Sequence, residues 1–172
     1  MALTQDQLTR LRDDIAAHPV WGTVPQNGNN AYTIAEAYNL PATPDFWVYR
    51  TALGKREIYE ETSPEGTVWN WDTWMAQTAT ERDAWVEMFN TTVAVINPSL
   101  AQARNGINTI FKGTTGPVVA QRTHLNAMYR RLASAAEKLF VTSGAGTTSS
   151  PGLMGYEGDI SMSDVEQCWA IP

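Results

Sequence analysis

The spacing of the apolar residues is the feature of this sequence that most restricts its fold. In several stretches, large apolar side chains recur every three or four residues, and Pro, Gly or Asn residues separate these stretches. This spacing places the apolar residues on one face of an α-helix, because an α-helix completes a turn in 3.6 residues. Thr4 and Gln7 add the pattern of a capping box, which marks a helix start. We therefore expect a mainly α-helical protein.

The individual stretches predict a small bundle of five or six helices with a minor hairpin. Five helices of the bundle are expected over residues 4–17, 31–39, 81–94, 100–111 and 118–140, and a short terminal helix over 164–169. Residues 44–53 predict the sixth helix of the bundle, because Thr43 and Pro44 favour a helix start and Gly54 favours a helix end. A strand is the alternative there, since aromatic and β-branched residues fill 46–49. Residues 64–71 predict a turn and a short extended piece or hairpin.

The segment from Thr142 to Gly152 interrupts this helical pattern. All eleven of its residues are Gly, Ala, Ser, Thr or Pro, and connections of this length are uncommon within a compact domain. The chain then resumes with large apolar side chains, among them Leu153, Met154, Tyr156, Ile160 and Trp169. We therefore expect a helical bundle domain (1–141), a flexible strap (142–152) and an extended C-terminal arm (153–172) that docks on another polypeptide. The alternative is an internal loop with a tail that packs on its own bundle.

The charges are unevenly distributed along the chain. The net charge is −6, yet residues 99–140 carry six basic side chains and one acidic side chain. The acidic total argues against tight binding of nucleic acid. A basic segment between acidic ones favours contacts within the chain or between copies, and a solvated helix face is the alternative.

No residue pattern predicts catalysis, a cofactor site or a metal site. His18 and His124 lie far apart without Cys or His at ligand spacing, and acidic residues surround Cys168. The Gly-rich segment has no Lys, and it does not lead from a strand into a helix, as a phosphate-binding loop does. Aromatic residues at 46–49 and 69–74 favour a core or a subunit interface over stacking on sugars or bases. We expect a non-enzymatic protein without cofactors.

Four segments resemble a family of small virion proteins encoded by tailed bacteriophages. They are LTQDQLTRLRDDIAAHP, IAEAYNLPATPDFWVYRT, ERDAWVEMFNTTVAVINPSLAQARNGINTIFKG and AQRTHLNAMYRRLASAAEKLFVTSGAGTTSSPGLMGYEGDISMSDV, and they span nearly the whole chain. The most specific pieces are PDFWVYRT and INPSLAQAR, together with the RTHL, RRLASAAEKLF and EGDISMSDV series. The resemblance implies a structural component of the phage particle. By analogy of fold, it suggests a head–tail connector or adaptor, which is a small helical ring protein.

A connector of this kind would act in the neck of the virion, after synthesis in the cytoplasm of the bacterial host. Its partners would be further copies in a homo-oligomeric ring, with twelve as one candidate size, a portal protein and a tail or stopper protein. Genomic DNA would pass nearby without tight binding, and no apolar run is long enough for a membrane span. The candidate subunit-interface residues are Arg122, Arg130, Arg131, Leu153, Met154, Tyr156, Ile160 and Trp169. The alternatives are a tail-terminator, tail-tip or capsid-decoration protein, or an unrecognised phage enzyme.

Overall fold

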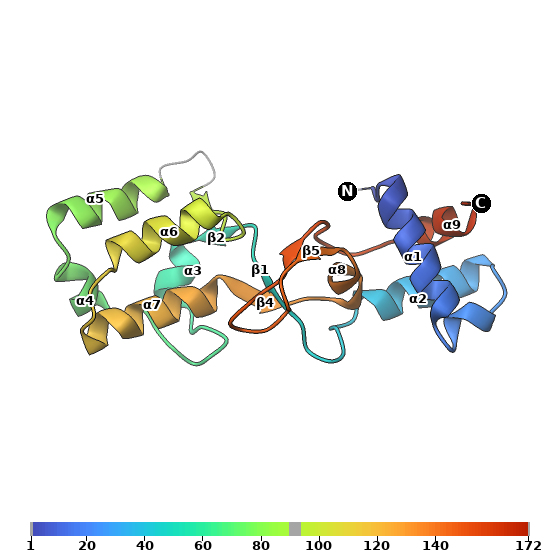
Figure 1. Ribbon diagram of the computed structural model, residues 1–172, viewed down its shortest axis with the longest axis horizontal. Helices are drawn as coiled ribbons and strands as arrows, with labels where there is room; N and C mark the ends of the chain where they lie inside the picture. The colour runs from blue at the N-terminus through green and yellow to red at the C-terminus, as the bar shows by residue number, and fades with distance from the viewer. Residues whose placement is uncertain (1, 90–93, 172) are drawn as a thin grey trace. The chain divides into compact units, whose positions relative to one another are not determined.

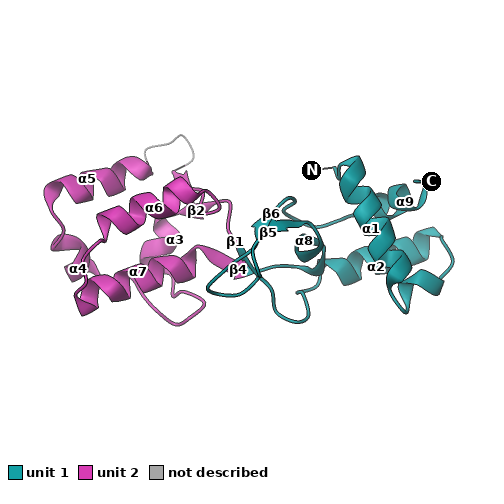
Figure 2. Cartoon of the chain, in the orientation of Figure 1, with its two compact units in different colours: residues 1–48, 132–172 teal, residues 49–131 magenta. Residues whose placement is uncertain are grey.

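The computed structural model describes residues 2–89 and 94–171 and divides the chain into two compact units (Figure 2). Unit 1 combines the two ends of the chain, Met1–Val48 and Leu132–Pro172, and unit 2 is the middle part, Tyr49–Arg131. The chain passes from unit 1 to unit 2 within β1 (Trp47–Tyr49) and returns within β4 (Arg130–Leu132). As expected, the protein is mainly helical. It also has small antiparallel sheets, but none of their strands falls within residues 64–71, so the prediction of a hairpin there is wrong. The division itself differs from the expected bundle, strap and arm.

Unit 1 is built from helices of both chain ends. Its elements are α1 (Gln5–Ala17), the 3₁₀-helix η1 (Trp21–Thr23), α2 (Gly28–Asn39), α8 (Ala135–Leu139), β5 (Val141–Ser143), β6 (Leu153–Met154) and α9 (Met162–Trp169). The side chain and backbone of Thr4 and Gln7 form the predicted capping box at the start of α1. The buried face of α1 consists of Leu8, Leu11 and Ile15, which confirms the helical spacing in this stretch.

The C-terminal segment belongs to the core of unit 1. Helix α9 packs against α1 and α2 (Figure 1), and Val165 and Cys168 are fully buried there. Tyr156 and Ile160 join the same core, at 6% and 3% exposure. The expectation of an extended arm is therefore wrong for this chain. Burial of these apolar side chains on α1 and α2 is favourable without any partner, so the alternative of a tail that packs on its own bundle is correct.

The Gly- and Ser-rich segment is an ordered hairpin loop and not a slack strap. Strands β5 and β6 pair antiparallel on either side of it. The loop also holds Trp47, whose backbone N–H donates to the carbonyl of Gly146 and whose carbonyl accepts from the N–H of Gly152, both at 2.8 Å. Gly144 and Gly146 have φ values of +96° and +71°. These left-handed conformations suit glycine, so the composition of this segment reflects its backbone path.

Unit 2 is built from the helices and strands of the middle part of the chain. They are β2 (Leu53–Gly54), α3 (Lys55–Glu60), α4 (Trp71–Met75), α5 (Ala79–Met88), β3 (Val95–Ile96), α6 (Ala101–Ile110) and α7 (Gly116–Met128). Strands β2 and β3 pair antiparallel, with Leu53 opposite Ile96. The core is rich in aromatic rings: Trp69 lies 5.3 Å from Trp85 and 6.0 Å from Phe111, measured between ring centroids. The aromatic stretch at 69–74 therefore serves mainly as core.

Two predicted helices differ from the structure: the first is interrupted and the second does not form. The chain leaves the helix predicted over 118–140 after α7, runs through β4, and re-enters a helix at α8. The extended part between α7 and α8 forms backbone hydrogen bonds. The N–H of Ala133 donates to the carbonyl of Phe46, and the carbonyl of Ala133 accepts from the N–H of Ala42. Residues 44–53 are not helical, and the alternative of a strand is correct for 47–49. The aromatic residues there fit extended backbone better than helix.

Smaller differences concern the helix starts. The helix predicted over 81–94 begins earlier, because Thr78 and Glu81 form the capping box. Its predicted end, from residue 90 to residue 93, lies outside the described residues. At α9 the capping box is formed by Ser161 and Asp164. Both changes move the helix start by two residues, which is the usual uncertainty of a helix boundary in sequence patterns.

Candidate functional site

The three candidate interface arginines make contacts within the protein. The guanidinium of Arg122 donates to the carbonyl of Phe111 and, at 2.6 Å, to that of Gly113. Arg130 pairs with Glu65, and its side chain is only 11% exposed. Arg131 is half-buried and also has an interaction within the chain. These side chains stabilise unit 2, because charge-assisted hydrogen bonds to them are strong, and they do not form a free basic face.

The five apolar candidates from the expected arm lie in unit 1. Tyr156 and Ile160 are buried, whereas Leu153, Met154 and Trp169 are half-buried. Trp169 packs against the core that α1 and α2 share. The structure thus brings the C-terminal candidates together, but as parts of one folded unit.

Polar side chains that the sequence did not single out hold this segment in place. The amide of Asn39 donates to the carbonyl of Ile160 and accepts from its N–H, both at 2.9 Å. The buried carboxylate of Glu137 accepts from the N–H of Gly158 at 3.1 Å. These contacts satisfy backbone groups of an irregular segment. No local pattern around Asn39 signals the role, because its partner is 121 positions away.

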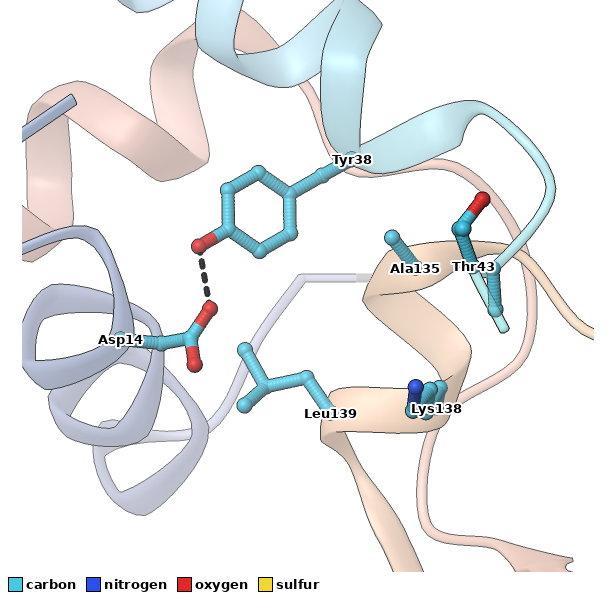
Figure 3. Close-up of a pocket in the computed structure, with 7 residues that line it drawn as sticks. Asp14, Tyr38, Thr43, Ala135, Lys138 and Leu139 are labelled. Atoms are coloured by element: carbon cyan, nitrogen blue, oxygen red, sulfur yellow. Dashed lines mark hydrogen bonds between the residues drawn. The ribbon is translucent and has the colours of Figure 1, made fainter. Parts of the chain in front are cut away.

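A pocket of about 360 Å³ opens in unit 1 between α1, α2 and α8 (Figure 3). Its lining consists of Asp14, Tyr38, Ala42, Thr43, Ala135, Lys138 and Leu139. The hydroxyl of Tyr38 donates to the carboxylate of Asp14, and the Tyr38 ring is buried. Burial, and then the hydrogen bond and negative charge of Asp14, raise the pKa of Tyr38 far above its usual range. Tyr38 is therefore a neutral donor at physiological pH and not a base.

Lys138 gives this pocket its only cation, and its ammonium lies 5.8 Å from the centre of the Phe46 ring. The pocket combines one carboxylate and one ammonium group with an apolar wall. Its volume is within the range of small-molecule sites. The lining, all of it within the described residues, has no His or Cys that could serve as a nucleophile or general base.

A second hollow, the α4–α7 groove, lies in unit 2 and has a volume of about 420 Å³. We define it by its lining residues, Asn70, Asp72, Thr73, Ala76, Thr115, Pro117 and Val118. Helix α4 and the start of α7 lie side by side around it (Figure 1). Three exposed apolar side chains flank these lining residues in the chain: Trp71, Met75 and Val119 are 52%, 63% and 41% exposed. The groove was not predicted from the sequence; of the three flanking residues, only Trp71 lies in a stretch for which the sequence favoured a core or a subunit interface.

Outside the pockets, the titratable side chains of His124 and Cys168 are buried in the protein. His124 is fully buried, with Nε2 at 2.9 Å from the carbonyl of Ile58 and Nδ1 at 3.3 Å from the hydroxyl of Thr67. Burial raises the pKa of the Cys168 thiol to about 11, so the thiol is a poor nucleophile, in line with the sequence interpretation. Within residues 2–89 and 94–171, no group of His, Cys, Asp or Glu is arranged to hold a metal ion.

In comparisons with known proteins, no family model, no curated protein and no solved structure matches the chain. In the part of the chain that the structure describes, no helix is both long and apolar enough to cross a bilayer.

Proposed function

We propose that this protein is a structural subunit of a tailed-phage particle, and specifically a head–tail connector that assembles as a ring between a portal protein and a tail or stopper protein. The proposal rests on the resemblance of four long segments to phage virion proteins. It does not depend on a C-terminal arm, since residues 153–171 are part of unit 1.

The exposed apolar surface of unit 2 is the observation that carries an assembly role. Val68, Trp71 and Met75 are 62%, 52% and 63% exposed, and they fall within one short stretch of the chain. Clustered large apolar side chains on a surface mark sites of protein association more often than isolated ones do. A ring subunit needs such surfaces on at least two sides, because it contacts neighbours as well as the components above and below it.

The proposal is tested on purified particles of a phage that encodes this protein. Quantitative mass spectrometry should find the protein in the particle, and immunogold labelling should place it at the neck in about a dozen copies. Copy numbers in the hundreds would indicate a decoration protein, and labelling along or at the end of the tail would indicate a tail protein. A protein that washes away from purified particles would refute a structural role in the virion.

A further inference from the structure

The pocket between α1, α2 and α8, called here the unit 1 pocket, holds two charges of opposite sign. Asp14 is exposed and Lys138 is half-buried, and both line the pocket. Within residues 2–89 and 94–171, neither side chain takes part in an ion pair. Figure 3 shows the two side chains on opposite sides of Leu139. The pocket therefore presents a negative group and a positive group separately to a molecule that enters it.

Tyr38 holds the carboxylate of Asp14 in place. Its hydroxyl donates to Oδ2 of Asp14, and its ring is buried in the core of unit 1. Among the residues that the structure describes, no other group donates a hydrogen bond to Asp14, so the second carboxylate oxygen is open to a ligand. A carboxylate that is already fixed loses little conformational freedom when it binds a cation. Asp14 is thus a pre-positioned acceptor for an ammonium group.

The wall between the two charges is apolar. Ala42, Ala135 and Leu139 supply the apolar side chains of the lining, and Leu139 lies between Asp14 and Lys138 in the close-up (Figure 3). A molecule that reaches both charges therefore crosses an apolar surface. An aliphatic chain suits this path, because contact with the wall removes apolar area of both partners from water. The volume of about 360 Å³ is that of a small-molecule site.

These features distinguish between the possible classes of ligand. A simple cation that pairs with Asp14 would share the pocket with the like charge of Lys138, and a simple anion would share it with Asp14. An uncharged apolar molecule would remove water from both charged groups and replace it with nothing. A molecule with an ammonium group at one end and a carboxylate at the other complements both charges.

We propose that the unit 1 pocket binds a small zwitterion of the ω-amino acid class, with its ammonium group at Asp14, its carboxylate at Lys138 and its aliphatic chain along Leu139. An α-amino acid fits less well, because it carries both charges on one carbon atom and the pocket separates them. The inference does not rest on the proposed function, since it concerns a site within unit 1 and not an assembly surface.

The test titrates the full-length, isotope-labelled protein with three probes of equal length and follows the amide chemical shifts by NMR. The probes are ε-aminocaproate, which carries both charges, n-hexylamine, which carries only the ammonium group, and caproate, which carries only the carboxylate. We expect ε-aminocaproate to bind at least about threefold more tightly than either analogue, because each analogue lacks one ion pair. The largest shifts should fall on lining residues such as Thr43 and Ala135. A second series with γ-aminobutyrate, n-butylamine and butyrate tests a shorter chain.

Two substitutions test the two ends of the ligand separately. Asp14→Asn keeps an oxygen that accepts from Tyr38 but removes the negative charge, so ε-aminocaproate should then bind no more tightly than caproate. Lys138→Met keeps the aliphatic part of the side chain, and ε-aminocaproate should then bind no more tightly than n-hexylamine. General damage to the fold would weaken all three probes alike, so the change in preference reports the charge contact itself.

Each substitution has a matched control outside the pocket. Asp13→Asn removes the neighbouring carboxylate, which is 63% exposed and pairs with Arg12. Lys55→Met removes an ammonium that also lies 5.8 Å from the centre of an aromatic ring, that of Tyr59. Neither Asp13 nor Lys55 lines the pocket, so both variants should keep the affinities of the unmutated protein for all three probes.

Equal affinities of the three probes in both series would overturn the proposal, as would equal losses from Asp14→Asn and Asp13→Asn. If no probe binds but a peptide with Lys and Glu side chains shifts the same amides, the pocket receives a segment of a protein and the proposal is wrong. Absence of the protein from purified particles would refute the proposed function and leave these titrations unaffected, so the two failures can be told apart.

Discussion

Ile160→Ala tests whether the C-terminal segment is part of the folded core. The Ile160 side chain is 3% exposed, and it packs in a cluster with residues of α1 and α2. Replacing a buried Ile by Ala removes apolar contacts and leaves a cavity, at a cost of about 2–5 kcal/mol. Small domains are stable by about 5–15 kcal/mol, so this single change would remove a large part of the stability of unit 1.

Met162→Ala is the matched control, because Met162 lies two residues further along and is 39% exposed. Its cost should stay below about 1 kcal/mol, as is usual at exposed sites. Asn39→Ala adds an independent test: it deprives the Ile160 backbone of both hydrogen bonds. A loss of about 1–3 kcal/mol follows from leaving such groups unsatisfied.

The assay is urea unfolding followed by tryptophan fluorescence, together with hydrogen exchange read by mass spectrometry for each unit separately. We expect faster exchange in α1, α2 and α9 of the Ile160→Ala variant and unchanged exchange in unit 2. Equal stabilities of the Ile160→Ala and Met162→Ala variants, with rapid exchange of α9 in the unmutated protein, would refute the placement of this segment in the core.

Three further predictions follow from single residues. Because burial raises the pKa of Cys168 to about 11, a thiol reagent at pH 8 should modify Cys168 only as fast as unit 1 unfolds, which absorbance kinetics in increasing urea measures. Because the pKa of Tyr38 is raised in the folded protein, the contribution of this side chain to folding stability is complete below the unfolded-state pKa of about 10. It is lost as the pH rises above that value. The free energy of unfolding, measured by urea titration, should therefore fall less between about pH 9 and pH 11 for Tyr38→Phe than for the unmutated protein. Gly146→Ala should lower the melting temperature more than Gly158→Ala: both have positive φ, but only at Gly146 would a Cβ collide with the Phe46 ring.

The helices with an apolar face and a local start signal could be predicted from the sequence. Helix α1 lies almost where its pattern placed it, because the Thr4 capping box and the spacing of Leu8, Leu11 and Ile15 are local features of the chain. The helix predicted over 118–140 was too long, since the apolar repeat continues through β4 into α8. A signal for the restart was present: Ser134 and Glu137 form a capping box.

The candidate sites could not be predicted in the same way, because they depend on contacts between distant parts of the chain. The unit 1 pocket joins Asp14 to Lys138, and the α4–α7 groove joins residues near 72 to residues near 117. The C-terminal segment had the composition of either a docking arm or a core segment. Only the position of α1 and α2 decides between these, since it provides an apolar surface within the same chain.

The basic stretch of the sequence shows why a run of charges does not predict a charged surface. The carbonyls at the end of a helix lack partners within the helix, and arginines from later elements supply them here. Arg122 of α7, within the basic stretch, donates to Phe111 and Gly113 after α6. Arg82 of α5, outside that stretch, donates in the same way to Met75 and Gln77 at the end of α4. The positive charge of these residues therefore compensates the partial negative charge of helix ends. Arg56 and Lys112, by contrast, pair with Glu60 and Glu81 while their own side chains stay 85% and 73% exposed, so the surface charge of unit 2 depends on which cations the fold places at its helix ends and not on the number of charges in a run.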